Sequence, residues 1–147
     1  MIPLAEVAAH FRNARYAVRP ALEREMKHAM ETAAKDAKSF IGDNKLGWAP
    51  LAESTLRSKA ARGYPTPAPL LREGTLRDSI SSKVEVAGAL IKGEVGSTDP
   101  VSVFHEFGTS KMPPRPFIAP ACMLAVEPLE KALGKLMVRA LTPGATP

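Results

Sequence analysis

The stretch HEFGTSKMPPRPFIAPA, residues 105–121, marks the place where the chain changes direction before its last helix. It begins with a histidine beside a glutamate, passes through a Gly-Thr pair and a Met-Pro-Pro-Arg-Pro-Phe run, and ends where helical spacing starts afresh. A glycine at position 108 can supply positive φ, and the prolines fix φ in the segment that follows. The stretch therefore predicts a turn and then a stiff arm that carries Arg115 and Phe117.

The arm allows two interpretations. A stiff segment loses little conformational entropy on binding, so the arm would suit contact with another subunit. Alternatively, Phe117 pins the loop to its own domain. His105 and Glu106 also have a structural interpretation, because either side chain can cap backbone groups where the chain turns. The candidate interface residues are Trp48, Tyr64, His105, Glu106, Met112, Arg115 and Phe117.

Histidine followed by glutamate also invites comparison with zinc hydrolases, in which HExxH places two imidazoles on one face of a helix. The fifth position here is Thr109, and neither His10 nor His28 has ligand spacing. No phosphate-cradling glycine loop, dinucleotide-binding glycine motif or nucleophile elbow occurs. The one cysteine, Cys122, has the apolar neighbours of a buried thiol and excludes an internal disulfide. We therefore expect no enzyme activity, no metal site and no cofactor.

Helical spacing dominates both ends of the chain. It predicts a short amphipathic helix that starts at Leu4 and ends before Pro20, and then a longer helix over residues 20–41. The apolar stripe of the longer helix fits core packing in a globular fold, and it also fits a coiled coil. After Pro120 helical spacing returns, with a break or kink expected at Pro128.

The segment after the long helix is rich in turn residues. Residues 43–50 form a loop whose tryptophan, Trp48, is either an anchor onto the core or an interface residue. Residues 54–62 have room for two helical turns, whereas three prolines make residues 63–69 an exposed, stiff loop. A capping-box-like start then predicts a short helix over residues 76–81.

Two alternating segments, residues 83–86 and 91–95, predict a β-hairpin with glycine and alanine between them. The inward side chains would be Val84, Val86, Ile91 and Val95, and the charged ones between them would stay solvated. Residues 101–107 form either a helical turn or a strand end. The sequence thus predicts one α+β domain over residues 1–141, followed by a disordered tail over 142–147. In this domain a small antiparallel or mixed sheet packs against a long N-terminal helix, with a C-terminal helix.

A chain of 147 residues with a net charge of +5 is large enough for one hydrophobic core. The basic residues are spread along the chain without forming a block, which favours a mixed-charge surface. Nonspecific DNA binding is the alternative that the positive charge leaves open. Charged residues interrupt the early apolar stretch, so no signal peptide is expected, and the longest uncharged run, 116–126, is too short for a membrane span.

Five motifs follow one another along the chain. They are Gly47-Trp48-x-Pro50-Leu51, then Pro69-Leu70-Leu71 with Gly74, Leu76 and Ser79-Ile80, then Val95-Gly96, then His105-Glu106-Phe107-Gly108-Thr109, and then Met112-Pro113-x-Arg115-Pro116-Phe117. Together these motifs resemble one family, the neck or tail-component (tail-completion) proteins of siphophages and prophages. A related class, the Mu-like virion-morphogenesis proteins, has the same motif order. The resemblance covers residues 47–121, and the motif over residues 105–117 is the specific one.

The resemblance implies a structural virion protein that forms a ring at the head-tail junction or at the head-proximal end of the tail. The expected partners are other copies of the chain in a hexamer, a head-closure (stopper) protein, and a tail terminator or tail tube protein. DNA would pass through the channel without sequence-specific binding. The expected location is the virion, after assembly in the cytoplasm of the host bacterium.

Overall fold

The structure, a computed structural model, describes residues 4–142. Two long helices and a β-hairpin account for most of this length, so the chain is α+β and its sheet is antiparallel, as predicted. The predicted disordered tail lies outside the described residues except for Thr142, the C-cap of α5. The elements are α1 (Leu4–Phe40), α2 (Glu53–Ala61), α3 (Thr75–Asp78), β1 (Ile80–Ala87), β2 (Leu90–Ser97), α4 (Val101–Phe107) and α5 (Ile118–Leu141).

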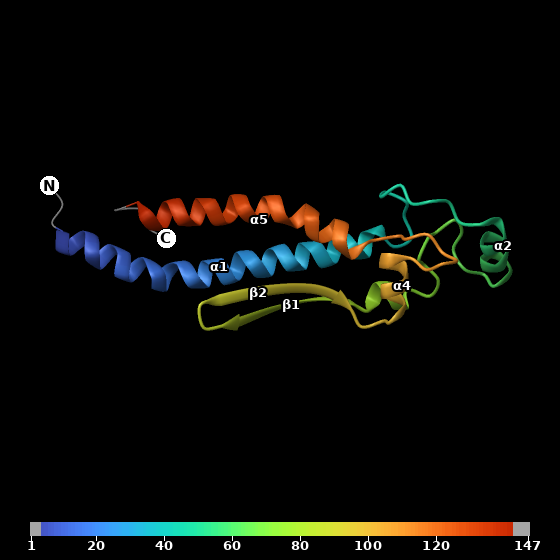
Figure 1. The fold of residues 1–147 in the computed structure, drawn as a ribbon, viewed down its shortest axis with the longest axis horizontal. Coiled ribbons are helices and arrows are strands. Elements are labelled where there is room, and N and C mark those ends of the chain that lie inside the picture. Colours follow the sequence, from blue (N-terminus) through green and yellow to red (C-terminus); the bar gives the residue numbers. More distant parts are fainter. Residues whose placement is uncertain (1–3, 143–147) are drawn as a thin grey trace.

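The first helix is continuous, and the predicted break before Pro20 was wrong. α1 runs through Pro20, although a proline inside a helix removes a hydrogen bond and costs about 3 kcal/mol. Packing offsets this cost, because α1 contacts α5 and the hairpin and buries Ala21 directly after the proline. Its apolar stripe serves packing within the chain, since Ala33 and Ala37 are completely buried. α5 also continues as one helix through Pro128, so the expected break is absent, but its orange N-terminal part lies at an angle to the red remainder (Figure 1), which agrees with the alternative expectation of a kink.

Figure 1 shows an elongated molecule in which α5 runs antiparallel along α1. The hairpin lies along α1 as well, and α2 and α4 lie at the end of the molecule where α1 finishes and α5 begins. A helix of 37 residues is about 55 Å long, so α1 sets the length of the molecule. The short elements therefore gather at one end of a long two-helix arm.

The hairpin confirms the predicted strands and extends them. Val86 pairs with Ile91 and Val84 with Gly93, so the predicted inward side chains share one face. Val84, Ile91 and Val95 are partly buried there, but Val86 next to the turn is 40% exposed, so its predicted inward position was wrong because α1 does not fully cover this end of the hairpin. Gly93 touches α1: a Cβ added there would lie 2.6 Å from Cγ of Met30. The short helix predicted over 76–81 begins earlier, at Thr75, and ends at Asp78, because Gly74 is its N-cap at φ 96° and Ile80 already belongs to β1.

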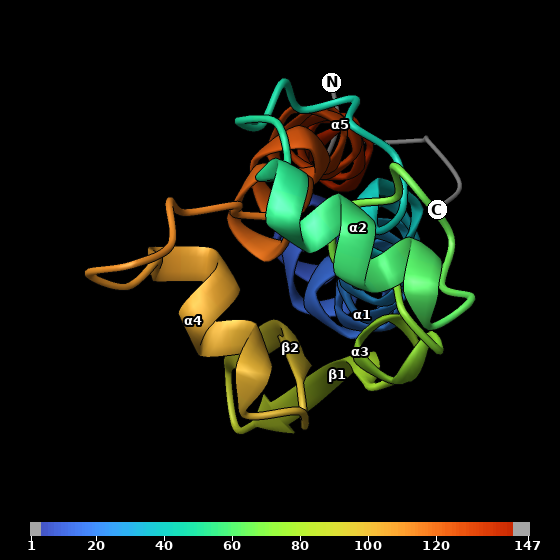
Figure 2. The same ribbon diagram turned by 90° about the vertical axis from the view of Figure 1, so that its right-hand side faces the viewer.

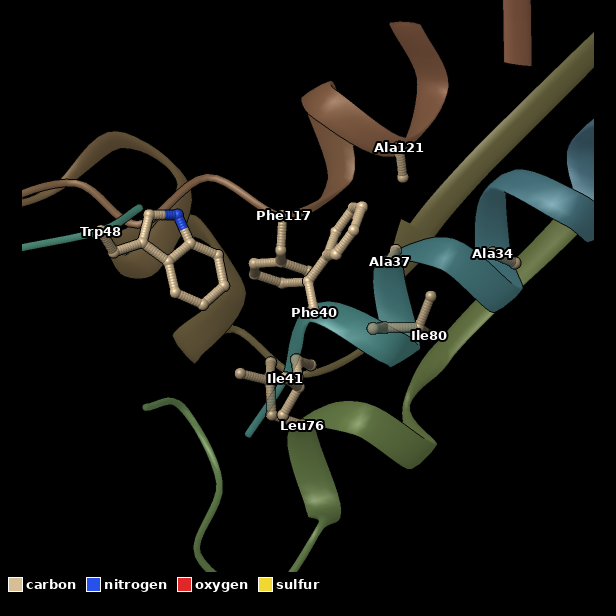
Figure 3. Close-up of a cluster of buried hydrophobic side chains, with 9 residues drawn as sticks. All are labelled: Ala34, Ala37, Phe40, Ile41, Trp48, Leu76, Ile80, Phe117 and Ala121. Atoms are coloured by element: carbon tan, nitrogen blue, oxygen red, sulfur yellow. The ribbon is translucent and has the colours of Figure 1, made fainter. Parts of the chain in front are cut away.

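The hydrophobic core lies where the end of α1, the root of the hairpin and the start of α5 meet (Figure 3). Phe117 and Ile80 are its largest completely buried side chains. Trp48 closes the core from the loop after α1, and its indole N–H donates to the carbonyl oxygen of Pro116 at 3.1 Å. The core therefore joins segments that are far apart in the sequence.

Candidate interaction surface

The end of the molecule that carries the core also carries an open groove of about 810 Å³. Figure 2 looks at this end and shows α2 across it and α4 projecting to one side. The loop before α2, the segment from Tyr64 to Leu76, α4 and the arm after Gly108 all contribute to the lining. Four of the predicted site residues line the groove, namely Tyr64, His105, Met112 and Arg115.

Arg115 does not project from the arm into solvent. Its side chain is 6% exposed, and its Nη2 donates to the carbonyl oxygens of Ala49 at 3.0 Å and Pro50 at 3.3 Å. Its backbone N–H donates to the carbonyl oxygen of His105 at 2.7 Å. The guanidinium therefore fastens the arm to the loop before α2, which corrects the expectation that Arg115 is presented for an external contact.

Phe117 and Trp48 are also held inside the chain's own domain. Phe117 has no exposed surface and Trp48 is buried beside it, so neither side chain offers a face to a second subunit. The structure therefore agrees with the second interpretation of the arm, in which Phe117 pins the loop to its own domain. The interpretation of Trp48 as an anchor onto the core is confirmed.

Glu106 caps the last helix. Its carboxylate accepts hydrogen bonds from the backbone N–H groups of Phe117 at 3.0 Å, Ile118 at 3.2 Å and Ala119 at 2.8 Å. These are donors that the first turn of α5 leaves unpaired, and a negative charge is favourable there. The structural interpretation of Glu106 is thus confirmed, although it caps α5 and not the turn at Gly108. Burial, and then the nearby Glu106 charge, raise the pKa of Cys122, which is half-buried.

His105 lies half-buried in the wall of the groove. Its Nδ1 and the Nε of Arg115 are the buried side-chain nitrogens that have no hydrogen-bond partner within residues 4–142. Burial lowers the pKa of His105, and the positive charge of Arg115 lowers it further. The imidazole is therefore held toward its neutral form.

Lys59 is a buried residue that the sequence did not single out. It is 6% exposed, and its ammonium group donates to the carbonyl oxygens of Ala68 and, at 2.7 Å, Leu71. Burial, and then the charge of Arg72, lower its pKa. Lys59 thereby fastens the proline-rich loop over residues 63–69 to α2, a role for which the sequence carries no signal because the partners are backbone atoms.

Tyr64 is fixed in the same region. Its hydroxyl donates to Oε1 of Glu73 at 3.1 Å, and the guanidinium of Arg72 lies 5.9 Å from the centre of its ring. Lys111 and Asp99 also line the groove, so its wall carries charges of both signs. The basic side chains, Lys59, Arg72, Lys111 and Arg115, outnumber the acidic ones, Glu73 and Asp99. Nonspecific DNA binding stays a prediction.

α4 exposes several large apolar side chains at this end, and the first turns of α5 expose Met123 and Leu124. Val103, Phe104 and Phe107 are 55%, 54% and 78% exposed. Ser102 is buried and Glu106 caps α5, so the polar residues of this helix face inward and the apolar ones face solvent. Sequence reasoning missed this surface because a short apolar run resembles a core segment.

Comparisons with protein-family models, with curated proteins and with solved structures found no match to this chain. In residues 4–142, no three histidine, cysteine, aspartate or glutamate side chains are grouped so that they could hold a metal ion. Over the same residues, every helix is too short or too polar to cross a membrane.

Proposed function

We propose that this chain is a structural virion protein of a tailed bacteriophage. It is a neck or tail-completion subunit that forms a homo-oligomeric ring at the head-tail junction or at the head-proximal end of the tail. The proposal rests on the motif resemblance over residues 47–121. One observation of the structure carries it: motifs that are separate in the sequence come together at one end of the molecule. Trp48, Ile80 and Phe117 share the core there, and Leu51, Leu70 and Arg115 line the adjoining groove.

The exposed apolar residues of α4 support a role in assembly. Monomeric proteins in water seldom leave neighbouring large apolar side chains uncovered, because such patches drive association. Val103, Phe104 and Phe107 are exposed although the chain has a core in which such side chains would be buried. A subunit that acts by packing against other subunits accounts for this exposure.

In the proposed neck, the partners are other copies of the chain in a ring of six, a head-closure (stopper) protein on one side, and a tail terminator or tail tube protein on the other. DNA passes through the channel without sequence-specific recognition. The protein is assembled in the cytoplasm of the host bacterium and remains in the virion.

Electron microscopy of particles made without this gene tests the proposal. We expect DNA-filled heads and separate tails, with joining restored when the purified protein is added. A ring in images of the purified protein, alone or mixed with the products of neighbouring genes, is the second expected result. Normally tailed, infectious particles from the deletion strain would contradict the proposal. A salt-sensitive shift of duplex DNA, without any effect on joining, would favour the DNA-binding alternative.

A further inference from the structure

A second, smaller hollow of about 210 Å³ lies beside α2 and adjoins the groove, with which it shares Lys59. Among the described residues, its lining holds cations and hydroxyl groups but no carboxylate. The cations are Lys59, Arg62 and Arg72, and the aliphatic hydroxyl groups are those of Ser54, Thr55 and Ser58. We call this site the α2 hollow. It is smaller than the roughly 300–1,000 Å³ of drug-sized ligand pockets, so it suits a single small group.

Lys59 is the buried cation of the α2 hollow. It is 6% exposed, and its ammonium group donates to the carbonyl oxygens of Ala68 and Leu71. An ammonium group has three donors, so one remains after these two bonds. Both carbonyl partners are uncharged, whereas a buried charge is stable only when it is paired and hydrogen-bonded. The hydrogen bonds of Lys59 are thus present, but its counter-charge is missing.

The other two cations of the hollow lack a counter-charge as well. In the part of the chain that the structure describes, the ion pairs involve other residues and leave out Lys59, Arg62 and Arg72. Glu73 is close in sequence, but it accepts a hydrogen bond from Tyr64 and lines the groove instead of the hollow. Arg72 adds to the imbalance, because its positive charge lowers the pKa of Lys59 beyond the effect of burial. A bound anion would compensate all three cations.

From this lining we propose that the α2 hollow binds a phosphate group. Guanidinium groups match phosphate oxygens in pairs, and a lysine supplies a compact positive charge. Arg62 and Arg72 are exposed, so a ligand can reach both of them. Three cations and several hydroxyl donors exceed what the two oxygens of a carboxylate accept, whereas a phosphate monoester offers three strong acceptor oxygens.

The phosphate has two chemical sources, a free phosphate or phosphate monoester and the phosphodiester backbone of DNA. Both present the same oxygens to the hollow. The proposal is independent of the head-tail role, because it concerns a site within one chain.

Binding of inorganic phosphate to the full chain tests the proposal, with sodium chloride used to keep the ionic strength constant. Calorimetry gives the affinity, and the rise of the melting midpoint with phosphate gives an independent measure. The test variant is Arg62→Gln, at the exposed C-cap of α2. Its matched control is Arg57→Gln, because Arg57 is an exposed residue of the same helix that lines neither the hollow nor the groove.

We expect Arg62→Gln to bind phosphate about tenfold more weakly than the parent, since one charge-assisted contact is lost, and Arg57→Gln to bind as the parent does. Ser58→Asp places a carboxylate in the hollow and should abolish binding by repulsion. Equal weakening in Arg57→Gln and Arg62→Gln would overturn the proposal, because net charge alone would then explain the binding. Phosphate that has no effect beyond that of chloride would overturn it too.

Adenosine monophosphate and a short duplex DNA, measured with the same variants, distinguish the two sources. Weaker binding of the duplex to Arg62→Gln than to Arg57→Gln would support the site and assign it to the DNA backbone. Duplex binding that is equal in the two variants, together with Arg62-dependent binding of adenosine monophosphate, would support the site and assign it to a phosphate monoester. Neither result decides the head-tail role, which the deletion strain tests separately.

Discussion

Gly108 sets the direction of the arm through a conformation that only glycine adopts readily. Its φ is 74° and its ψ is −178°, and an added Cβ would lie 2.8 Å from the backbone nitrogen of Pro114. We expect Gly108→Ala to lower the free energy of unfolding by about 3 kcal/mol or more, because strain and a backbone clash add. Urea unfolding measures this change.

Gly63 is the matched control for Gly108. Its φ is 72°, but a Cβ there meets no atom within 4 Å, so Gly63→Ala should cost only about 1 kcal/mol. If the two variants lost equal free energies of unfolding, the close contact between a Cβ at position 108 and Pro114 would contribute nothing.

The neutral state of His105 makes stability depend on pH. Its pKa is lowered in the folded chain by burial and by Arg115 and Arg72, with Asp99 acting in the opposite direction. Between the folded and unfolded pKa values the unfolded chain binds more protons, so stability falls as the pH drops below about 6.5. We expect His105→Gln to lose less stability than the parent between pH 7.5 and pH 5.0, measured by urea unfolding. Parallel pH profiles would contradict this assignment.

Individual residues show which features of the site could be predicted from the sequence. The need for glycine at position 108 was predictable, because its positive φ follows from a turn before prolines. The three backbone partners of Glu106 and the two of Lys59 were not, since these contacts join segments that only the folded chain brings together. The same holds for Arg115, whose carbonyl acceptors lie 65 and 66 positions earlier in the sequence.

At the scale of elements, the hairpin packs on α1 through a glycine. A Cβ at Gly93 would lie 2.6 Å from Cγ of Met30 and 2.8 Å from Sδ of Met26, so Gly93→Ala forces the hairpin away from α1 or the methionines aside. We expect a loss of about 1–3 kcal/mol in the free energy of unfolding, as for other overpacked cores. Thermal and urea unfolding both report this loss.

Gly96 in the same strand provides the comparison. A Cβ there has no neighbour within 4 Å, so Gly96→Ala should change stability by less than about 0.5 kcal/mol. Combining Gly93→Ala with Met30→Ala should restore part of the loss, because the overlapping side chain is removed. A loss in Gly96→Ala as large as in Gly93→Ala would instead point to an effect of glycine on the strand itself.

Elements were predictable where the local pattern and the packing agree. Alternation predicted the hairpin and, apart from the exposed Val86, its inward side chains, because one side of this sheet covers α1. The break at Pro20 was predicted wrongly because helix propensity is a weak prior, and contacts with α5 and the hairpin keep α1 continuous. The sequence did not decide whether residues 101–107 form a helical turn or a strand end. α4 exposes its apolar face, so periodicity alone could not identify which side is buried.

For the whole molecule, the exposed side chains of Val103 and Phe107 on α4 predict self-association that stabilises the fold. Because association favours the folded state, the midpoint of thermal unfolding should rise with protein concentration. Phe107→Ser should weaken association about 10–100-fold, since burying a phenylalanine contributes about 1.5–3 kcal/mol. Analytical ultracentrifugation measures the association, and the melting midpoint of the dilute protein should stay unchanged because Phe107 is 78% exposed.

Leu90 is a control of similar exposure at a different place, the turn of the hairpin, where it is 62% exposed. Leu90→Ser removes an exposed apolar side chain without touching α4, so its association constant should match that of the parent. If Leu90→Ser and Phe107→Ser weakened association equally, general hydrophobicity would explain the self-association. A selective effect of Phe107→Ser would instead locate the contact on α4, where a short helix exposes apolar side chains on one face and lines a groove with the other.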